Sequence, residues 1–68
     1  MTFRLAIDTD NAAFGDVPDE NVMARHMETA RILKDVAKRL EQGEDFEKYR
    51  TLFDINGNDV GRAAFKRA

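Results

Sequence analysis

The single histidine, His26, is the side chain best suited to proton transfer near neutral pH. The chain contains no serine and no cysteine, so His26 has neither a hydroxyl of serine nor a thiol to activate, and no thiolate with which to share a metal ion. It also falls inside a run of apolar residues with helical spacing. We therefore expect His26 to be a partly buried packing residue of a helix.

A second candidate for chemistry is Asp54-x-Asn56-x-Asn58, which matches the opening of a calcium-binding loop, where alternate residues supply oxygen ligands. The match ends there, because Gly57 comes two positions before the required glycine and Phe65 stands where the bidentate glutamate belongs. The sequence predicts a hairpin turn at this place and no metal site.

The remaining residue types favour a protein without catalytic function. The 13 carboxylates could include a catalytic pair, but such a pair needs a cleft that separates the two pKa values. Sixty-eight residues leave no room for a cleft between domains. The four glycines are scattered and form no phosphate-binding loop. We expect no enzyme activity and no cofactor.

Composition sets the class of protein. A hydrophobic fraction of 43% and a charged fraction of 35% indicate one folded domain, residues 1–68, with a polar surface. The formal net charge of −2 argues against bulk, non-specific nucleic-acid binding. The absence of cysteine excludes a disulfide scaffold, and no stretch approaches the roughly 20 apolar residues of a membrane span. We expect a soluble protein of a reducing cytoplasm.

The first half of the chain predicts a strand, an acidic loop and a long helix. Phe3, Leu5 and Ile7 alternate with polar residues, as in a strand with one buried face. The loop 8–20 follows, with Phe14 as its one large apolar residue, expected to anchor it against the start of the helix. The helix is expected to span Asp19–Gln42, with Gly43 ending it.

One face of this helix is predicted to be buried. The apolar residues that recur there at spacings of three and four are Val22, Met23, Met27, Ala30, Leu33, Val36, Ala37 and Leu40. We expect Leu33 and Val36 to join Leu5, Ile7, Leu40 and Val60 in one core. The opposite face is polar and carries Arg39, and Ile32 is expected to be exposed there.

The second half predicts two strands, 49–55 and 60–65, joined by a tight turn. The turn is either a type I turn from Asp54 closed by Gly57 with a positive φ, or a two-residue Asn56-Gly57 turn. The choice decides which of Leu52 and Phe53 faces the core. The whole is an α+β domain of order β-α-β-β, a three-stranded antiparallel sheet with one long helix on one face.

Two surfaces could bind partners. The uncovered sheet face is expected to hold Arg4, Arg50 and Arg62, with Lys66 and Arg67 beyond and an aromatic residue among them, as in single-stranded nucleic-acid platforms. It or an edge strand could also form a homodimer. For a protein partner, the predicted contact residues are Asp10, Asp16, Asp19, Ile32, Arg39, Phe53 and Asp59.

Three segments carry a resemblance: Thr9-Asp10-Asn11-Ala12-Ala13-Phe14, Ala30-Arg31-Ile32-Leu33, and Asp54-Ile55-Asn56-Gly57-Asn58-x-Val60-Gly61. In these the chain resembles a group of small uncharacterised phage and prophage proteins, although its segment between Phe14 and Ala30 is longer. The resemblance implies an accessory protein that inhibits or modulates a host protein complex, as anti-CRISPR proteins do. The alternatives are a nucleic-acid-binding module and a minor virion or assembly component.

Overall fold

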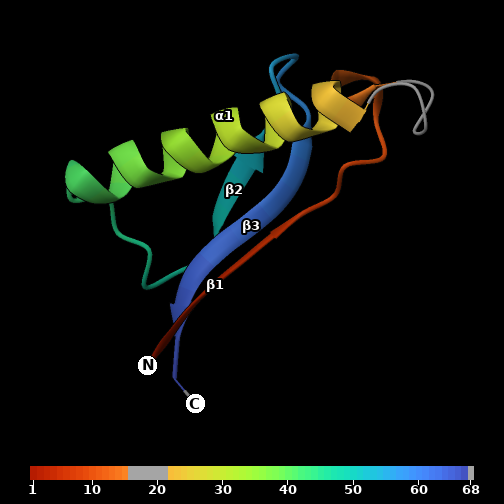
Figure 1. Cartoon of the computed structure of the whole chain (residues 1–68). Helices are drawn as coiled ribbons and strands as arrows, with labels where there is room; N and C mark the ends of the chain where they lie inside the picture. The colour runs from red at the N-terminus through yellow and green to blue at the C-terminus, as the bar shows by residue number, and fades with distance from the viewer. Residues whose placement is uncertain (16–21, 68) are drawn as a thin grey trace.

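The computed structural model describes residues 1–15 and 22–67, and it has the predicted α+β architecture (Figure 1). The elements follow the order strand, short helix, long helix, strand, strand. They are β1 (Thr2–Ile7), the 3-10 helix η1 (Ala12–Phe14), α1 (Val22–Glu41), β2 (Arg50–Phe53) and β3 (Asp59–Lys66). The predicted start of the helix at Asp19 lies outside the described residues.

The sheet is antiparallel, with β3 between β1 and β2 (Figure 1). Phe3 pairs with Phe65 and Leu5 with Ala63 across β1 and β3. At Gly61 the two strands approach so closely that a Cβ atom would lie 1.9 Å from the carbonyl oxygen of Ala6. Gly61 is therefore required by the packing of β1 on β3, and its backbone conformation is an ordinary one.

The core lies between the sheet and α1, which crosses one face of the sheet above β2 in the view of Figure 1. Phe14 of η1 is buried in it, as its position in the acidic loop predicted. The fully buried cluster comprises Phe14, Ile32, Val36, Phe46, Leu52, Val60 and Ala63, and Phe3, Leu5, Ile7 and Leu40 are partly buried against it. Phe46, in the connection between α1 and β2, is a core residue that the sequence analysis missed.

Val36 is buried as predicted, but the predicted inward face of α1 as a whole is wrong by about a third of a turn. The residues that point into the protein are Glu28, Ile32 and Val36. Ile32, expected to be exposed, keeps only 2% of its surface accessible, whereas Leu33, expected in the core, is 46% exposed. His26 is likewise exposed and does not pack in the core.

The physical reason is that α1 has apolar residues on two sides. A hydrophobic pattern identifies an apolar stripe but does not tell which of two stripes the rest of the chain covers. Here the polar residue Glu28 lies on the buried side, where its carboxylate binds Arg31 and a backbone amide of the hairpin turn. The hydrogen-bonded carboxylate of Glu28 can be buried, so this side of α1 faces the core. A hydrophobicity pattern nevertheless scores Glu28 as polar and assigns the side to solvent.

Gly43 ends α1, as predicted. Its φ is +82°, a left-handed conformation that glycine adopts without steric cost. The amide of Gly43 donates to the carbonyl of Leu40 and the amide of Glu44 to that of Arg39, both at 3.0 Å. This pair of hydrogen bonds is a Schellman motif, and it turns the chain back toward the sheet.

The hairpin between β2 and β3 adopts the first of the two predicted turns. The amide of Gly57 donates to the carbonyl of Asp54 at 3.0 Å, and the φ of Gly57 is +84°. The amide of Asp54 in turn donates to the carbonyl of Asn58 at 2.9 Å. In this register Leu52 is buried and Phe53 is exposed. Among the described residues, no helix is both long and apolar enough to span a membrane.

Candidate functional site at the end of the hairpin

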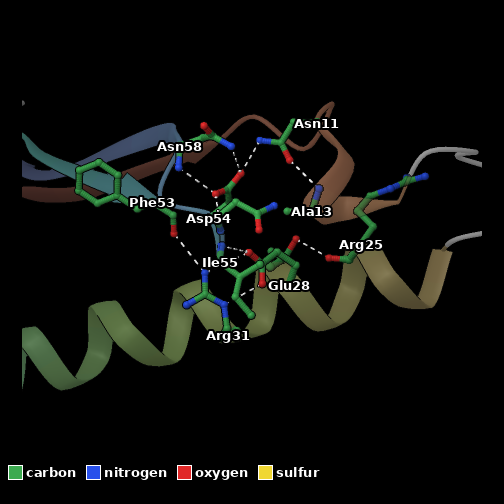
Figure 2. A network of polar contacts seen from close by, with 11 residues as sticks. Asn11, Ala13, Arg25, Glu28, Arg31, Phe53, Asp54, Ile55 and Asn58 are labelled. Atoms are coloured by element: carbon green, nitrogen blue, oxygen red, sulfur yellow. Dashed lines mark hydrogen bonds and ion pairs between the residues drawn. The ribbon is translucent and has the colours of Figure 1, made fainter.

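The carboxylate of Asp54 organises the turn between β2 and β3 (Figure 2). One oxygen, Oδ1, accepts hydrogen bonds from the backbone amides of Asn56 and Asn58, both at 2.9 Å. The other, Oδ2, accepts from the side-chain amides of Asn11 at 2.8 Å and Asn58 at 3.1 Å. Asp54 is buried, and all four of its partners are neutral N–H groups. The turn is therefore held from inside by one carboxylate.

These hydrogen bonds determine the charge state of Asp54. Burial by itself would raise its pKa, but the donors from Asn58, Asn11 and Asn56 stabilise the carboxylate and hold its pKa below the usual value. Both carboxylate oxygens of Asp54 thus accept hydrogen bonds from N–H groups. These donors stabilise the negative charge of the carboxylate and disfavour a cation beside its oxygens. Within residues 1–15 and 22–67 no group of three or more acidic or histidine side chains is arranged to hold a metal ion.

A second carboxylate, Glu28, ties α1 to the same turn (Figure 2). Arg31 binds it through two hydrogen bonds, Nε to Oε1 at 2.7 Å and Nη2 to Oε2 at 3.0 Å. The amide of Ile55 donates to Oε2 at 2.8 Å, and Arg31 Nη2 also donates to the carbonyl of Phe53 at 3.1 Å. The hydrogen bond from Arg31 lowers the pKa of Glu28, burial opposes it, and the amide of Ile55 adds to the lowering.

The two carboxylates join the three sequence segments that contain Asn11, Arg31 and Asp54. Asn11 comes from the first segment, Arg31 from the second, and Asp54 and Asn58 from the third. Every buried side-chain nitrogen or oxygen in the described part of the chain has a hydrogen-bond partner. These polar residues consequently work as connections between loop, helix and turn.

Two large apolar side chains project from this fixed turn. Phe53 is 52% exposed and Ile55 is 69% exposed. Asp59 is the cross-strand partner of Phe53, and Asp10 lines a shallow depression together with Asp59. We call these four residues, Asp10, Phe53, Ile55 and Asp59, the hairpin-end surface. On the side toward α1, Ile55 lines a groove with the exposed Met27.

The structure thus gathers three of the predicted partner residues, Asp10, Phe53 and Asp59, and separates the others. Asp16 and Asp19 lie outside the described residues. The prediction for Ile32 is wrong, because this side chain is buried in the core.

Arg39 also lies away from the hairpin-end surface. It binds Glu44 through its Nε and Nη2 atoms, and Asp35 lies 3.7 Å from its Nη1 atom at the predicted spacing of four residues. The hydrogen bond from Arg39 lowers the pKa of Glu44. Arg39 also donates to the carbonyl of Thr51 in β2. These contacts give it a role in fixing α1 and the following connection to β2.

Ile55 was not predicted as a surface residue of this site, and for Met27 the core was preferred over an adaptable contact surface. For Ile55 the sequence did contain a signal, because it is an apolar residue in the middle of an Asp-x-Asn-Gly turn, where side chains usually point to solvent. Met27 was assigned to the core with the rest of its apolar stripe. It is exposed because α1 is rotated relative to the predicted orientation.

The uncovered sheet face partly matches its prediction. Arg4, Arg62 and Tyr49 line one shallow depression on it. The Nζ atom of Lys66 lies 3.8 Å from the centre of the Tyr49 ring, a cation–π contact that already occupies the aromatic face. Arg50 is not part of this surface, because it pairs with the core residue Ala63 and donates to the carbonyl of Asp45.

Comparisons with known protein families, with characterised proteins and with solved structures found no match to this chain.

Proposed function

We propose that this protein is a non-enzymatic phage accessory protein that docks on a host bacterial protein complex through the hairpin-end surface and inhibits or modulates it. The observation that carries the proposal is the exposure of Phe53 and Ile55 on a turn whose backbone is fixed by Asp54 and Glu28. The phage setting, the anti-CRISPR-like role and the bacterial cytoplasm rest on the resemblance of the three segments.

Rigidity gives these two apolar side chains their value for binding. Association costs free energy for every loop and side chain that must be ordered, so a turn ordered in advance loses less. The backbone of residues 54–58 makes two hydrogen bonds within the turn, and its amides make three more to the carboxylates of Asp54 and Glu28. Phe53 and Ile55 therefore present their apolar surface in one arrangement, as anchors at the centre of protein interfaces do.

The charge around these anchors indicates the kind of partner. Asp10 and Asp59 are exposed, and Asp8 lines the same depression. Charges at the rim of an interface mainly accelerate association and select for partners of opposite sign. The favoured partner is a protein surface with an apolar pocket bordered by lysine or arginine, such as the nucleic-acid-binding channel of a host effector complex.

The test uses bacteria that carry an active CRISPR system and express the tagged protein, with phage plating and affinity capture as readouts. We expect the parent to restore plating and to capture a component of the immune complex. Phe53→Ser and Ile55→Ser should lose both properties without a change in the melting temperature. The matched control is Tyr49→Ser, an exposed aromatic residue at the other end of β2. If the parent captures no host protein and plating does not change, the proposal is refuted.

A second candidate function, single-stranded nucleic-acid binding, is favoured by the placement of Arg4, Arg62 and Tyr49 in one depression. Its test is the fluorescence anisotropy of labelled oligonucleotides across a range of salt concentrations. Binding that weakens with salt and is lost in Arg4→Ala and Arg62→Ala would place this function first. Detection of the protein in purified phage particles would instead support a virion component.

A further inference from the structure

The two edges of the sheet differ in how their backbone groups are covered. Because β3 lies in the middle, β1 and β2 each have one side without a neighbouring strand. The N–H and C=O groups on such a side attract a further strand unless something blocks them. On β2 the carbonyls of Thr51 and Phe53 accept hydrogen bonds from two side chains of α1, Arg39 at 3.4 Å and Arg31 at 3.1 Å. β2 is also only four residues long and ends in a register shift, so its edge is closed.

The edge of β1 is open along its whole length (Figure 1). β1 pairs with β3 in one regular register over six residues and contains no proline. The amide of Asp8 donates to the carbonyl of Val60 in β3. Since alternate residues of an antiparallel strand bond to opposite sides, the backbone groups of Phe3, Leu5 and Ile7 point away from β3. Within residues 1–15 and 22–67 these groups have no hydrogen-bond partner.

The side chains of the same three residues are incompletely covered. Phe3, Leu5 and Ile7 pack against the core, yet all three are only half-buried. The reason is that α1 crosses the sheet above β2 and leaves the side of β1 less covered (Figure 1). A depression of about 950 Å³ borders every one of residues 3–8. A further strand beside β1 would therefore satisfy its backbone groups and bury the apolar surface that the fold leaves accessible.

The other face of β1 indicates the charge of that strand. Arg4 is exposed on the uncovered sheet face, and Ala6 pairs there with Arg62 of β3. Because Ala6 is small, the long side chain of Arg62 can extend over it toward the open edge. Neither arginine forms an ion pair in the described part of the chain. Asp8, the acid that follows β1, belongs to the depression at the hairpin end. The open edge is thus bordered by two uncompensated positive charges.

We infer that the edge of β1 binds an extended segment of a partner protein in which apolar and acidic residues alternate, and that this segment joins the sheet as an antiparallel strand. Its apolar residues lie opposite Phe3, Leu5 and Ile7, and its acidic residues lie beside Arg4 and Arg62. In this mode of recognition the backbone hydrogen bonds give affinity and the alternate side chains give specificity. The inference goes beyond the proposed function, because this edge is separate from the hairpin-end surface.

The chemistry of the edge favours this occupant over two others. A second copy of the chain would bring another Arg4 and Arg62 to the same place, and like charges across strands are destabilising. A single-stranded nucleic acid needs free aromatic faces for stacking, whereas the ring of Tyr49 already carries Lys66 Nζ at 3.8 Å. A peptide strand matches the outward N–H and C=O groups of β1 with about six hydrogen bonds, two for each outward residue.

The first test uses a short fluorescein-labelled peptide of alternating valine and glutamate, with fluorescence anisotropy as the readout. Two further peptides are N-methylated, one at every valine and the other at every glutamate. The valines opposite Leu5 and its alternate neighbours direct their N–H groups at β1 in an antiparallel strand. Methylated valines should therefore abolish binding, and methylated glutamates should leave it intact. Equal binding of the two methylated peptides, the reverse pattern, or no binding of the unmethylated peptide overturns the inference.

The second test concerns charge. Arg4→Ala should weaken binding of the valine–glutamate peptide by up to about fivefold and reduce its salt dependence, because one cross-strand ion pair is lost. Lys38→Ala, which removes an exposed cation of α1, is the matched control and should change neither. Equal effects of the two substitutions would contradict the assigned position of the acidic residues. An oligonucleotide that binds while the peptide does not would assign the basic face to nucleic acid and overturn the inference.

Amide hydrogen exchange locates the bound strand. In the free protein the amides of Phe3, Leu5 and Ile7 should exchange faster than those of Arg4 and Ala6, which are bonded to β3. Saturating valine–glutamate peptide should slow the exchange of the first three amides. If these amides are instead protected in the free protein, increasingly so as its concentration rises, a second copy occupies the edge and the inference is wrong.

Discussion

Replacing Ile32 or its neighbour Leu33 with alanine distinguishes the observed orientation of α1 from the one that the sequence predicted. The two substitutions remove the same number of carbon atoms from adjacent positions of one helix, and both replace a residue with a better helix former. They differ only in burial, since Ile32 is 2% exposed and Leu33 is 46% exposed. The difference between their effects on the free energy of unfolding therefore measures which side of α1 faces the core.

The expected magnitudes follow from the buried groups. Ile32→Ala removes three buried carbons at about 0.8 kcal/mol each and leaves a cavity, so we expect a loss of about 3 kcal/mol. Leu33→Ala removes three carbons that are only about half buried and leaves no enclosed cavity, so about 1 kcal/mol is expected. A domain of this length has a total stability of roughly 3–10 kcal/mol, and Ile32→Ala should leave it barely folded.

The assay is urea unfolding followed by circular dichroism. Ile32→Ala should shift the midpoint much further than Leu33→Ala. A larger loss for Leu33→Ala than for Ile32→Ala would mean that α1 is rotated as the sequence predicted, and our account of the core would be refuted.

Two further predictions concern the turn and the sheet. The pKa values of Asp54 and Glu28 are lower in the folded protein than in the unfolded chain. The two ionised carboxylates therefore stabilise the fold above the unfolded pKa values, and this stabilisation is lost as the pH falls through the folded pKa values. The melting temperature should drop below about pH 4.5. Asp54→Asn should lower the melting temperature at neutral pH and weaken this acid dependence, whereas Asp59→Asn, an exposed control, should do neither. Gly61→Ala should prevent β1 from pairing with β3, because its Cβ would meet the Ala6 carbonyl, and amide exchange in β1 should become fast. Gly57→Ala should cost only about 1 kcal/mol, because its φ is strained but the space beside it is empty; equal losses for the two glycines would contradict this reading.

The sequence predicted the elements of the fold better than their packing. Alternation in residues 3–7, helical spacing up to Leu40 and the glycine at 43 gave the strand, the helix and its end, because these are local properties of the chain. The sequence left two hairpin turns open, and in the structure the Asp54 carboxylate that organises the turn is also bound by the Asn11 side chain, 43 residues away. No local pattern contains a contact of that separation.

The orientation of α1 failed for the same reason. Its buried side includes Glu28, a residue that a hydrophobicity pattern assigns to solvent, and its burial depends on Arg31 and on the amide of Ile55. The candidate site followed this error. Ile32 was chosen as an exposed anchor and proved to be core, while Ile55 and Met27 were missed. Asp10, Phe53 and Asp59 are exposed as expected, because they belong to a loop and a hairpin, whose exposure does not depend on which side of a helix is buried.

The three segments behind the phage resemblance can now be divided by what each residue does in the monomer. Asn11, Arg31, Asp54 and Asn58 join the polar network. Phe14, Ile32 and Val60 fill the core, and Gly61 permits the close approach of β1 and β3. Ala30 and Leu33 stand apart, because the monomer leaves one half-buried and the other half-exposed. The residues of the polar network and the core therefore fix the fold, whereas the side chains of Ile55 and its neighbour Phe53 take no part in either and stay exposed.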